Sequence, residues 1–514
     1  MSDEELYGRL ARLLAAEFIY EINLFPALEY SFKHALTSEI VYGALLRERR
    51  TYLHARIVGA LEEVAGDNLH DHIEALAHHA LRGELWDKAV AYLRQAGAKA
   101  MSHSALVEAL ANYGRALEAV EHVPDSPEKL KMQIDLHLDS RNVLFLMGDL
   151  PRVAQHLHQA ESLAETLGDQ QRLARVLNFL NSYYGLAGDP ERAIQIGQRT
   201  LKLAGIREDR ALNVVTHYYL GAAYNKTGQY NEAIKVLQHG MRSIDGELRH
   251  ERFGTTVVLS VICRSHLVQC LAATGRFSEG VRHGEEGVQI GEEVNDPVSL
   301  VHMNCSLGVL FLFRGEFEKA IAILERSLRI SHSANVPVYV PYAASRLGAA
   351  YAHSGRVSEA LRYLEDGVEN LAAAGRVAFL SLSTVWLSEG YLLCGRLDEA
   401  NAVANRALDL SRNHKERGHE AWALKMLGDI ALHREASQTE QAEAYYRQAF
   451  AVSDALGMQP LQAHCKFGLG NAHALMRAWD EARAELAAAA ELYRSMGMTF
   501  WFNRGEAALR NMAL

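Results

Sequence analysis

Apolar and small residues recur along this chain with a long, regular period. The repeated pattern is a glycine, then a polar residue, then an apolar residue, with a small residue five places after the glycine. The glycines are Gly148, Gly188, Gly228, Gly275, Gly315, Gly355 and Gly395, and the small residues are Ala193, Ala233, Gly280, Ala320, Ala360 and Ala400. Most of these glycines follow one another at about 40 residues, and a fixed period of 20 to 50 residues indicates a solenoid or another repeat array.

Each glycine stands between two segments with helical periodicity. Around Gly228 these segments are Leu212–Thr227 and Tyr230–Ile244, whose apolar and small residues recur three or four places apart. A glycine is favoured where a helix ends in the left-handed conformation. The small residues Gly221 and Ala233 let the two helices approach closely. Each unit is therefore predicted to be a helical hairpin that stacks on its neighbours, because one hairpin cannot bury its apolar face alone.

The chain is predicted to be all-α, a right-handed superhelical solenoid of such hairpins with a small N-terminal addition. Residues 66–125 are expected to form the first, irregular hairpins. Residues 126–514 form the array with a period of about 40 residues, ending in a capping helix over Gly497–Leu514, with Trp501 and Phe502 covering its last exposed face.

Residues 1–65 do not keep the period. Leu6–Ala16 is predicted to be a helix, and Phe18–Ile22 and Leu28–Phe32 alternate like two short strands of a β-hairpin. Ser31–Leu46 and Arg49–Val64 return to helical periodicity. A helix, a β-hairpin and further helices suggest part of a winged-helix unit.

Composition narrows the class of protein. The chain has 514 residues, a formal net charge of -10 and only nine prolines, which suits a helical protein and disfavours nucleic acid as the main partner. Its N-terminus is acidic, and we found no apolar run of the ~18 residues that would span a bilayer. A cytoplasmic protein with no membrane partner is expected.

The five cysteines form no Cys-x-x-Cys motif, and they fall within apolar helical segments. We therefore expect the cysteines to be free, buried thiols of a protein in a reducing compartment.

The repeat resembles the tetratricopeptide repeat (TPR). The pattern Leu220-Gly221, Tyr224, Gly228, Tyr230, Ala233 recurs as Leu307-Gly308, Phe311, Gly315, Phe317, Ala320 and as Leu347-Gly348, Tyr351, Gly355, Val357, Ala360. Tetratricopeptide units usually have 34 residues. The additional residues are expected to lengthen the helices and the links between hairpins.

Other segments resemble one group of bacterial signalling proteins. They are Glu29-Tyr30-Ser31-Phe32-Lys33-His34-Ala35-Leu36-Thr37, Tyr42–Leu46, Leu76–Gly83 and Gly497–Trp501. They look like parts of proteins in which a class III adenylate or guanylate cyclase domain and an AAA/STAND-type ATPase module precede a tetratricopeptide tail. The resemblance implies a regulatory or sensor tail joined to the end of the ATPase winged helix.

The ATPase motif itself is missing from this sequence. No G-x-x-x-x-G-K-[ST] loop is present, and a P-loop needs its glycines and lysine to hold phosphate. Catalysis by that group is therefore not carried over. We predict a protein that is not an enzyme and needs no cofactor, with a separately encoded ATPase or cyclase module as one candidate partner.

Two clusters of reactive side chains could have either a functional or a structural role. His70–His79 contains Glu74 and His78 at i,i+4, which allows a surface metal site, but His79 takes a packing position of the repeat. Structural histidines and no metal are predicted. Cys263 and His266 share a helix face, and a core thiol beside an imidazole is favoured over a nucleophile.

The predicted functional surface is the concave groove lined by the first helix of each hairpin. Its candidate residues are Arg175, Asn178, Tyr218, Asn225, Lys226, Gln269, His302 and Tyr342. Amides and phenols suit an extended peptide, and Val309, Leu312 and Phe313 add apolar positions. The prediction is a non-catalytic scaffold that binds a protein or peptide. The alternative is a sensor or enzyme that holds a small ligand or metal inside the superhelix. DNA binding through the winged-helix part is disfavoured.

Overall fold

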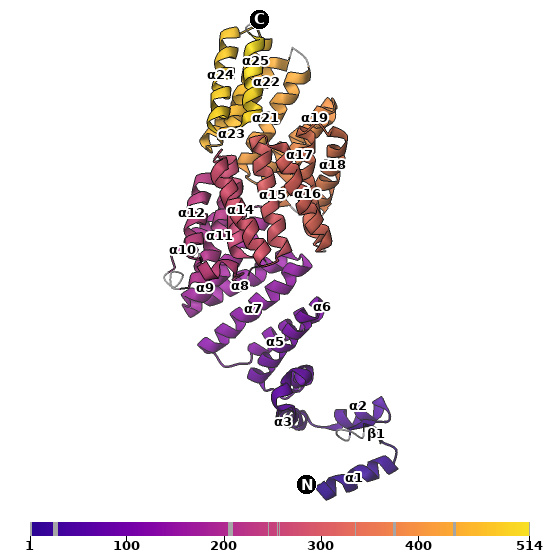
Figure 1. Ribbon diagram of the computed structural model, residues 1–514. Helices are drawn as coiled ribbons and strands as arrows, with labels where there is room; N and C mark the ends of the chain where they lie inside the picture. Colours follow the sequence, from indigo (N-terminus) through magenta and orange to yellow (C-terminus); the bar gives the residue numbers. More distant parts are fainter. Residues whose placement is uncertain are drawn as a thin grey trace. The chain divides into compact units, whose positions relative to one another are not determined.

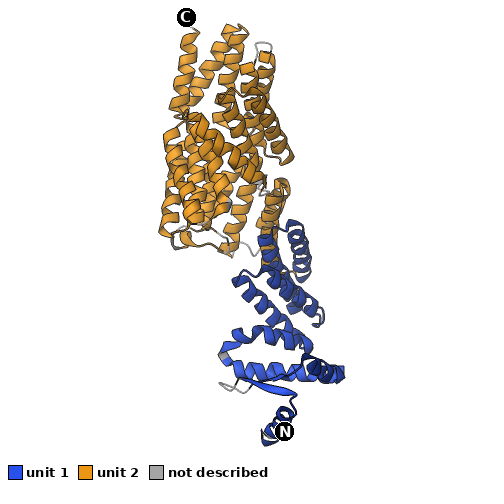
Figure 2. Cartoon of the chain, turned by 90° about the vertical axis from the view of Figure 1, so that its right-hand side faces the viewer, with its two compact units in different colours: residues 1–167 blue, residues 168–514 orange. Residues whose placement is uncertain are grey.

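The computed structural model describes residues 3–23, 29–203, 209–244, 246–253, 255, 257–334, 336–373, 377–434 and 438–512 (Figure 1). Within these ranges helices dominate, and the strands form one two-stranded sheet. The chain divides into two compact units, Met1–Leu167 and Gly168–Leu514 (Figure 2). The all-helical repeat architecture predicted from the sequence is confirmed. The predicted domain boundaries at residues 65 and 125 stay a prediction.

The first unit begins with a helix and a β-hairpin. Its elements are α1 (Asp3–Ala15), β1 (Ile19–Asn23), β2 (Glu29–Phe32), α2 (Ala35–Ala44), α3 (Arg47–Ala65), the 3-10 helix η1 (Gly66–His72), α4 (Ile73–Arg82), α5 (Trp86–Ser102), α6 (Leu106–Val120), α7 (Pro127–Met147) and α8 (Leu150–Leu167). β1 and β2 pair antiparallel, with Ile19 opposite Phe32. The predicted hairpin is confirmed, and its turn residues 24–28 lie outside the described residues.

Many apolar side chains of this N-terminal part are exposed. They are Tyr7, Phe18, Tyr20, Ile22, Leu36, Ile40, Val41 and Leu46. Large exposed apolar patches on a folded protein mark interaction surfaces. We call these residues the N-terminal apolar face.

The second unit is a continuous series of helical hairpins. Its helices are α9 (Gln170–Ala187), α10 (Pro190–Leu201), α11 (Arg210–Thr227), α12 (Tyr230–Arg242), η3 (Gly246–His250), α13 (Leu259–Ala273), α14 (Phe277–Glu293), α15 (Pro297–Arg314), α16 (Phe317–Ser333), η4 (Pro337–Tyr339), α17 (Val340–His353), α18 (Val357–Ala373), α19 (Val377–Leu393), α20 (Leu397–Asn413), α21 (Arg417–Arg434), α22 (Thr439–Ala455), α23 (Gln459–Leu475), α24 (Trp479–Ser495) and α25 (Thr499–Asn511). The odd-numbered helices from α9 to α23 are the first helices of their hairpins, and each packs on its own second helix. From α9 to α21 each also packs on the next first helix, and α25 stands in the position of a further first helix.

The repeated glycines end the first helices as predicted. All seven, from Gly148 to Gly395, have φ between +74° and +88°. At the early hairpin the pattern shifts by one residue, because Glu84 takes the positive φ and Gly83 does not. A side chain at Gly83 would instead lie 2.8 Å from the Ala55 backbone nitrogen, so close packing requires this glycine.

A second set of left-handed residues connects one hairpin to the next. Gly168, Asn295, Lys415, Gly457 and Gly497 all have positive φ. The links that contain these residues are short, such as residues 294–296 and 414–416. Most helices of the second unit have 17 or 18 residues. The residues beyond the usual repeat length therefore lengthen the helices, whereas these links stay short.

One helix is more apolar than expected from the sequence. By its length and composition α15 could cross a membrane, contrary to the expectation that the chain contains no such run. In the structure 72% of this stretch is buried inside the protein, as in the core helix of a repeat array.

The end of the array also differs from expectation. α25 forms a helix at the predicted end of the array, but Trp501 does not cover an outer face: it packs against Phe317 on α16, His353 on α17 and His464 on α23. The reason is that later helices of the array return to the first helices of earlier hairpins. A side chain at Gly315 would lie 3.0 Å from the Trp501 Nε1, and one at Gly228 would lie 2.9 Å from the Leu456 Cδ1. We call these the inter-turn contacts.

Candidate binding surface

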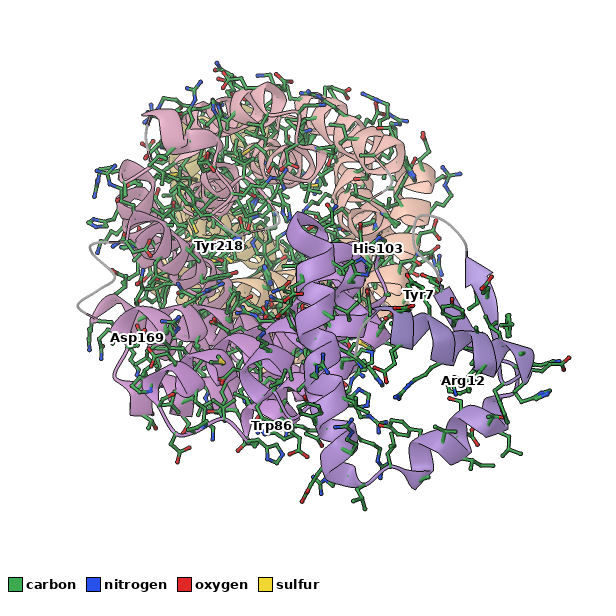
Figure 3. All side chains as sticks on the ribbon, turned by 90° about the horizontal axis from the view of Figure 1, so that it is seen from below. Tyr7, Arg12, Trp86, His103, Asp169 and Tyr218 are labelled. Carbon is green, nitrogen blue, oxygen red and sulfur yellow. The ribbon has the colours of Figure 1, made fainter. Side chains whose placement is uncertain are left out.

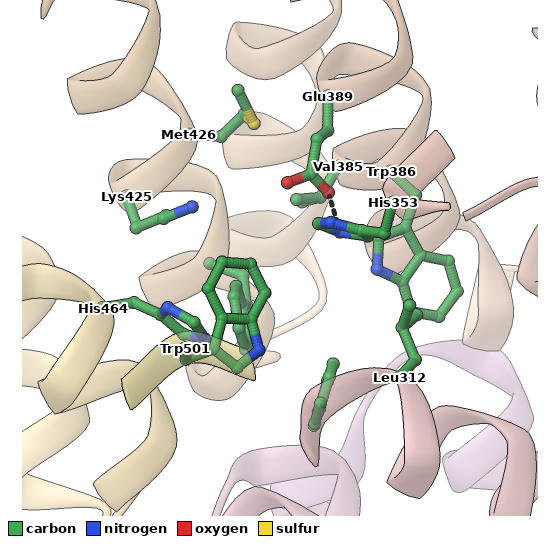
Figure 4. A pocket seen from close by; sticks show the side chains of 11 residues that line it. Leu312, His353, Val385, Trp386, Glu389, Lys425, Met426, His464 and Trp501 are labelled. Atoms are coloured by element: carbon green, nitrogen blue, oxygen red, sulfur yellow. Dashed lines mark hydrogen bonds and ion pairs between the residues drawn. The ribbon is translucent and has the colours of Figure 1, made fainter. Parts of the chain in front are cut away.

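A small cavity opens on the inner surface of the second unit. Its volume is about 30 Å³, and it is lined by Leu312, Phe313, His353, Val385, Trp386, Glu389, Trp422, Lys425, Met426, His464 and Trp501 (Figure 4). All of these residues belong to first helices, namely α15, α17, α19, α21, α23 and α25. We call this site the aromatic cavity. It exists because the inter-turn contacts bring α15 and α17 against α21 to α25.

Aromatic rings form much of the cavity wall. The ring of Phe313 stacks on that of Trp422 with centroids 5.0 Å apart, and Trp422 lies 5.8 Å from His464. His464 meets Trp501 edge-on at 4.6 Å, and Trp501 meets His353 edge-on at 5.8 Å. Rings in such offset or edge-to-face arrangements stabilise one another beyond the area they bury.

Glu389 places a carboxylate among these rings. Its Oε2 lies 3.2 Å from the His353 Nε2, and Figure 4 shows the carboxylate directed toward the space between His353, Lys425 and Trp501. Burial alone would raise the pKa of Glu389. The neighbouring His353 and Lys425 act in the opposite direction, and together they lower this pKa to about 2. The group is therefore charged at neutral pH.

Lys425 is the positive group of the cavity, and it already has a partner. Its Nζ lies 2.6 Å from the Asp429 Oδ2, and the Tyr446 hydroxyl donates to the other oxygen of Asp429 at 2.7 Å. Although burial opposes the charge, Asp429 and Glu389 raise the pKa of Lys425. Burial, aided by the charge of Lys425, lowers the pKa of His464 well below its usual value. Asp429 therefore offsets the charge of Lys425, and Glu389 contributes a carboxylate beside His353.

Three of the predicted groove residues lie together beside α11 and α13. The Asn225 amide donates to the Gln269 Oε1 at 2.9 Å, and the Gln269 amide donates to the Ser306 hydroxyl at 2.9 Å. The ring of Tyr218 lies 5.8 Å from that of His266, and Figure 3 shows Tyr218 inside the ring of helices. These hydrogen bonds link successive first helices along the inner surface. They form a half-buried polar ladder.

The other predicted residues divide into exposed and buried positions. Arg175 is exposed on α9. His302 is half-buried and packs against Tyr342, whose side chain is 2% exposed. Asn178 is also buried, at 3% exposure. Asn178 and Tyr342 are therefore not open to a partner in this conformation.

Lys226 takes part in an inter-turn contact. Its Nζ donates to the Gly185 carbonyl at 2.9 Å and lies 3.9 Å from the Glu416 Oε1. Glu416 is fully buried and also accepts hydrogen bonds from Ser381 and His419. Burial raises the pKa of Glu416, whereas its partners lower it. The pKa of Glu416 is lowered overall.

The two reactive clusters have structural surroundings. His79 Nδ1 lies 2.7 Å from the Nδ1 of His54 on α3, and in the described residues no group of three or more His, Cys, Asp or Glu side chains is placed to hold a metal ion. Burial raises the pKa of Cys263 to about 12 and lowers that of His266 to about 4. A thiol and an imidazole shifted in this way do not form an activated pair.

The cysteines are not uniformly buried. Cys263, Cys270, Cys305 and Cys465 are buried as expected, but Cys394 is exposed. It lies in the turn after α19, beside Gly395, and not within an apolar helix.

Of the residues that line the aromatic cavity, only Leu312 and Phe313 are among the groove positions predicted from the sequence. A signal was present in the register of the repeat. Lys226, Phe313 and His353 each stand two places before a repeated glycine, and each reaches the next superhelical turn. Likewise Gln269 and Glu389 each stand six places before a glycine.

Comparison with known sequences matches a limited segment of the chain. No protein-family model matches the chain. A segment of 134 residues is 31% identical to an uncharacterized protein of Rhizobium meliloti (strain 1021), and the match covers 24% of this chain but only 13% of that protein.

Solved structures are similar at low sequence identity. A Rap protein in complex with Competence and Sporulation Factor superposes with a TM-score of 0.54 and 11% identity, over 72% of this chain and 99% of its own. A STAND signal-transduction ATPase with a tetratricopeptide repeat sensor, from Pyrococcus horikoshii, gives a TM-score of 0.41 and 15% identity, over 74% of this chain and 54% of its own. By its repeats and its fold, the chain is a tetratricopeptide-like helical-repeat protein.

Proposed function

We propose that this protein is a non-catalytic interaction scaffold that binds a peptide or protein along the inner surface of its second unit. The observation that carries the proposal is the aromatic cavity, which gathers apolar rings and charged groups from six first helices. Recognition sites often combine aromatic anchors with a few placed polar groups. The Rap protein with a similar fold is described in complex with Competence and Sporulation Factor, which is consistent with a binding role for this fold.

The polar ladder beside the cavity would supply the remaining contacts. Tyr218, Asn225 and Gln269 are half-buried, so each keeps part of its surface for a partner. Amide side chains can bond an extended peptide backbone, and a Tyr side chain offers apolar area together with a hydroxyl. A peptide would thus be held by several modest contacts that end at one aromatic anchor site.

The N-terminal apolar face supports a more specific role. Exposed side chains such as Phe18, Leu36 and Leu46 would be covered if residues 1–65 completed the winged-helix unit of an ATPase module. In that arrangement the protein is the regulatory or sensor region of a cyclase-linked signalling ATPase, with that module encoded separately. Ligand binding to the array would then bias the attached module by favouring one conformation.

A small-ligand sensor is less well supported by the cavity. Sites for drug-sized ligands usually measure about 300–1,000 Å³, whereas the aromatic cavity measures about 30 Å³. It has room for a few water-sized groups, such as the end of a side chain.

Selection of peptides from a random display library tests the main proposal. The selected peptides are measured by fluorescence anisotropy against the native protein, the inner-surface variant Tyr218→Ala/Gln269→Ala, and the outer-surface variant Glu318→Ala/Lys319→Ala. We expect the inner variant to weaken binding at least about ten-fold and the outer variant to leave it unchanged. Failure to select any peptide, or equal loss in both variants, would overturn the proposal.

A further inference from the structure

The aromatic cavity combines an anionic group with several aromatic faces. Phe313, Trp386, Trp422 and Trp501 line it together with the Glu389 carboxylate (Figure 4). Aromatic rings attract cations through their negative faces, most strongly when Trp is involved. A carboxylate adds direct charge attraction and accepts hydrogen bonds from an ammonium group.

The charges around Glu389 leave it as the acceptor for an incoming cation. Lys425 is bonded to Asp429, which neutralises the positive charge on that side of the cavity. His353 meets only the Oε2 atom of Glu389, and no partner of Oε1 is found among the described residues. Because Glu389 stays ionised at neutral pH, its second oxygen is available to an N–H donor.

The size of the cavity limits what can enter. A volume of about 30 Å³ suits a group of a few heavy atoms and excludes a whole amino acid or nucleotide. An ammonium group on a short alkyl stem has this size, and its methylene groups would contact the rings.

We propose that the aromatic cavity is a receptor site for an alkylammonium group, which the Glu389 carboxylate accepts among the rings of Trp386, Trp422 and Trp501. The inference deepens the proposed function, on which it rests, by naming the chemistry of the partner at its anchor point. Since the cavity wall contains α15 as well as α21 to α25, the bound ammonium also reinforces the inter-turn contacts. Such a group can come from a lysine side chain, from the amino end of a chain or from a free polyamine.

Titrations with small probes test the site without knowledge of the partner. n-Butylammonium, n-butanol and butyrate are titrated into the full-length protein, and tryptophan fluorescence and calorimetry report binding. We expect saturable binding of n-butylammonium, with at least ten-fold weaker binding of the neutral and anionic analogues because they lack the charge-assisted hydrogen bonds. Equal binding of n-butanol would overturn the proposal, as would the absence of saturable binding by the ammonium probe.

Variants identify the groups responsible. Glu389→Gln keeps the size of the side chain and is expected to weaken n-butylammonium binding at least about ten-fold. The matched control is Glu318→Gln, an exposed carboxylate on the outer helix α16, which should change nothing. If Glu389→Gln unfolds, as circular dichroism would show, Trp422→Leu and Trp422→Phe replace it. Leucine should abolish binding and phenylalanine should retain part of it, whereas equal affinity of the two would contradict an aromatic site.

The source of the ammonium group is resolved by three further probes. These are N-acetyl-lysine methylamide, glycine amide and spermidine, which present a side chain, a chain end and a free polyamine. The selected peptides are also measured with their amines free and acetylated. If the peptides bind the inner surface but none of the ammonium probes binds, the ammonium site is wrong while the scaffold function stands. If the probes bind but acetylation of the peptides has no effect, the source is a free polyamine. If no peptide binds but the probes do, the scaffold function fails and the site stands.

Discussion

The Nζ of Lys226 on α11 lies 3.9 Å from the Oε1 of Glu416, the residue just before α21. This is one of the inter-turn contacts. Glu416 is fully buried, and the Lys226 side chain is 12% exposed. Burial lowers the pKa of Lys226 and Glu416 opposes that shift, so each charge depends on the other. Lys226, predicted to face a partner, thus also contacts a later hairpin, and its role toward a partner stays a prediction.

Replacing Lys226 by Met should lower stability. The substitution removes the ammonium group beside Glu416 and leaves a buried carboxylate with His419 and Ser381 as its partners. We expect a loss of about 1–3 kcal/mol, because the Gly185 carbonyl loses its hydrogen bond and the buried Glu416 carboxylate loses a nearby positive charge. Urea unfolding followed by circular dichroism measures it.

The control for this substitution is Lys235→Met. Lys235 pairs with Glu232 on the outer surface of α12, where its side chain is 69% exposed. Exposed pairs contribute at most about 1 kcal/mol, so this variant should unfold close to the native midpoint. Equal stability of the two variants would mean that the inter-turn ion pair contributes nothing.

The helical hairpins could be predicted from the sequence because their determinants are local. A glycine such as Gly228 must have a positive φ, and small residues such as Gly221 lie against a neighbouring side chain, Leu237. Both requirements repeat with the hairpin and appear directly in the order of residues. The β-hairpin near residue 20 was likewise predictable from its alternation.

The aromatic cavity could not be predicted because it depends on how far each hairpin rotates relative to the last. That rotation decides whether Phe313 meets Trp422 and whether Gly315 meets Trp501. The rotation results from many small packing preferences between neighbouring helices. None of these preferences can be recognised in the sequence of a single repeat. The residues in the correct register were visible, but their partners several repeats later were not.

Two glycines with the same backbone conformation allow the inter-turn contacts to be isolated. Gly315 has φ +88° and Gly355 has φ +87°, but only at Gly315 would a Cβ atom meet a later helix, at Trp501 and Phe500. Gly355→Ala should cost about 1–2 kcal/mol from backbone strain alone. Gly315→Ala should cost about 1–3 kcal/mol more, because Trp501 and Phe500 must move. Thermal unfolding measures both, and equal destabilisation would show that the contact adds no constraint.

Thiol reactivity should single out Cys394. It is the exposed cysteine of the described residues, whereas burial raises the pKa of Cys263, Cys270, Cys305 and Cys465. A buried thiol of raised pKa supplies little reactive thiolate. We expect one rapid reaction with Ellman's reagent at pH 8 in the native protein and five thiols in denaturant.

The variant Cys394→Ser provides the control for that measurement. It should remove the rapid phase and leave the slow phase of the buried thiols unchanged. A rapid phase that persists would mean that one of the other four cysteines becomes accessible through local opening.

Acid should weaken the protein through Glu389 in a defined pH range. Its pKa is about 2 in the folded protein and near 4.5 in the unfolded chain, so its contribution is complete above pH 4.5 and is lost as the pH falls toward 2. The shift corresponds to about 3 kcal/mol. Urea unfolding of the native protein and of Glu389→Gln at pH 7, 5, 4 and 3 should show a difference in midpoint that is constant from pH 7 to 5 and shrinks below. The exposed control Glu318→Gln should show no pH-dependent difference. A Glu389→Gln difference that grows as the pH falls would mean that the carboxylate is less stable as an anion in the fold than in water, which would also remove the basis for an ammonium site beside it.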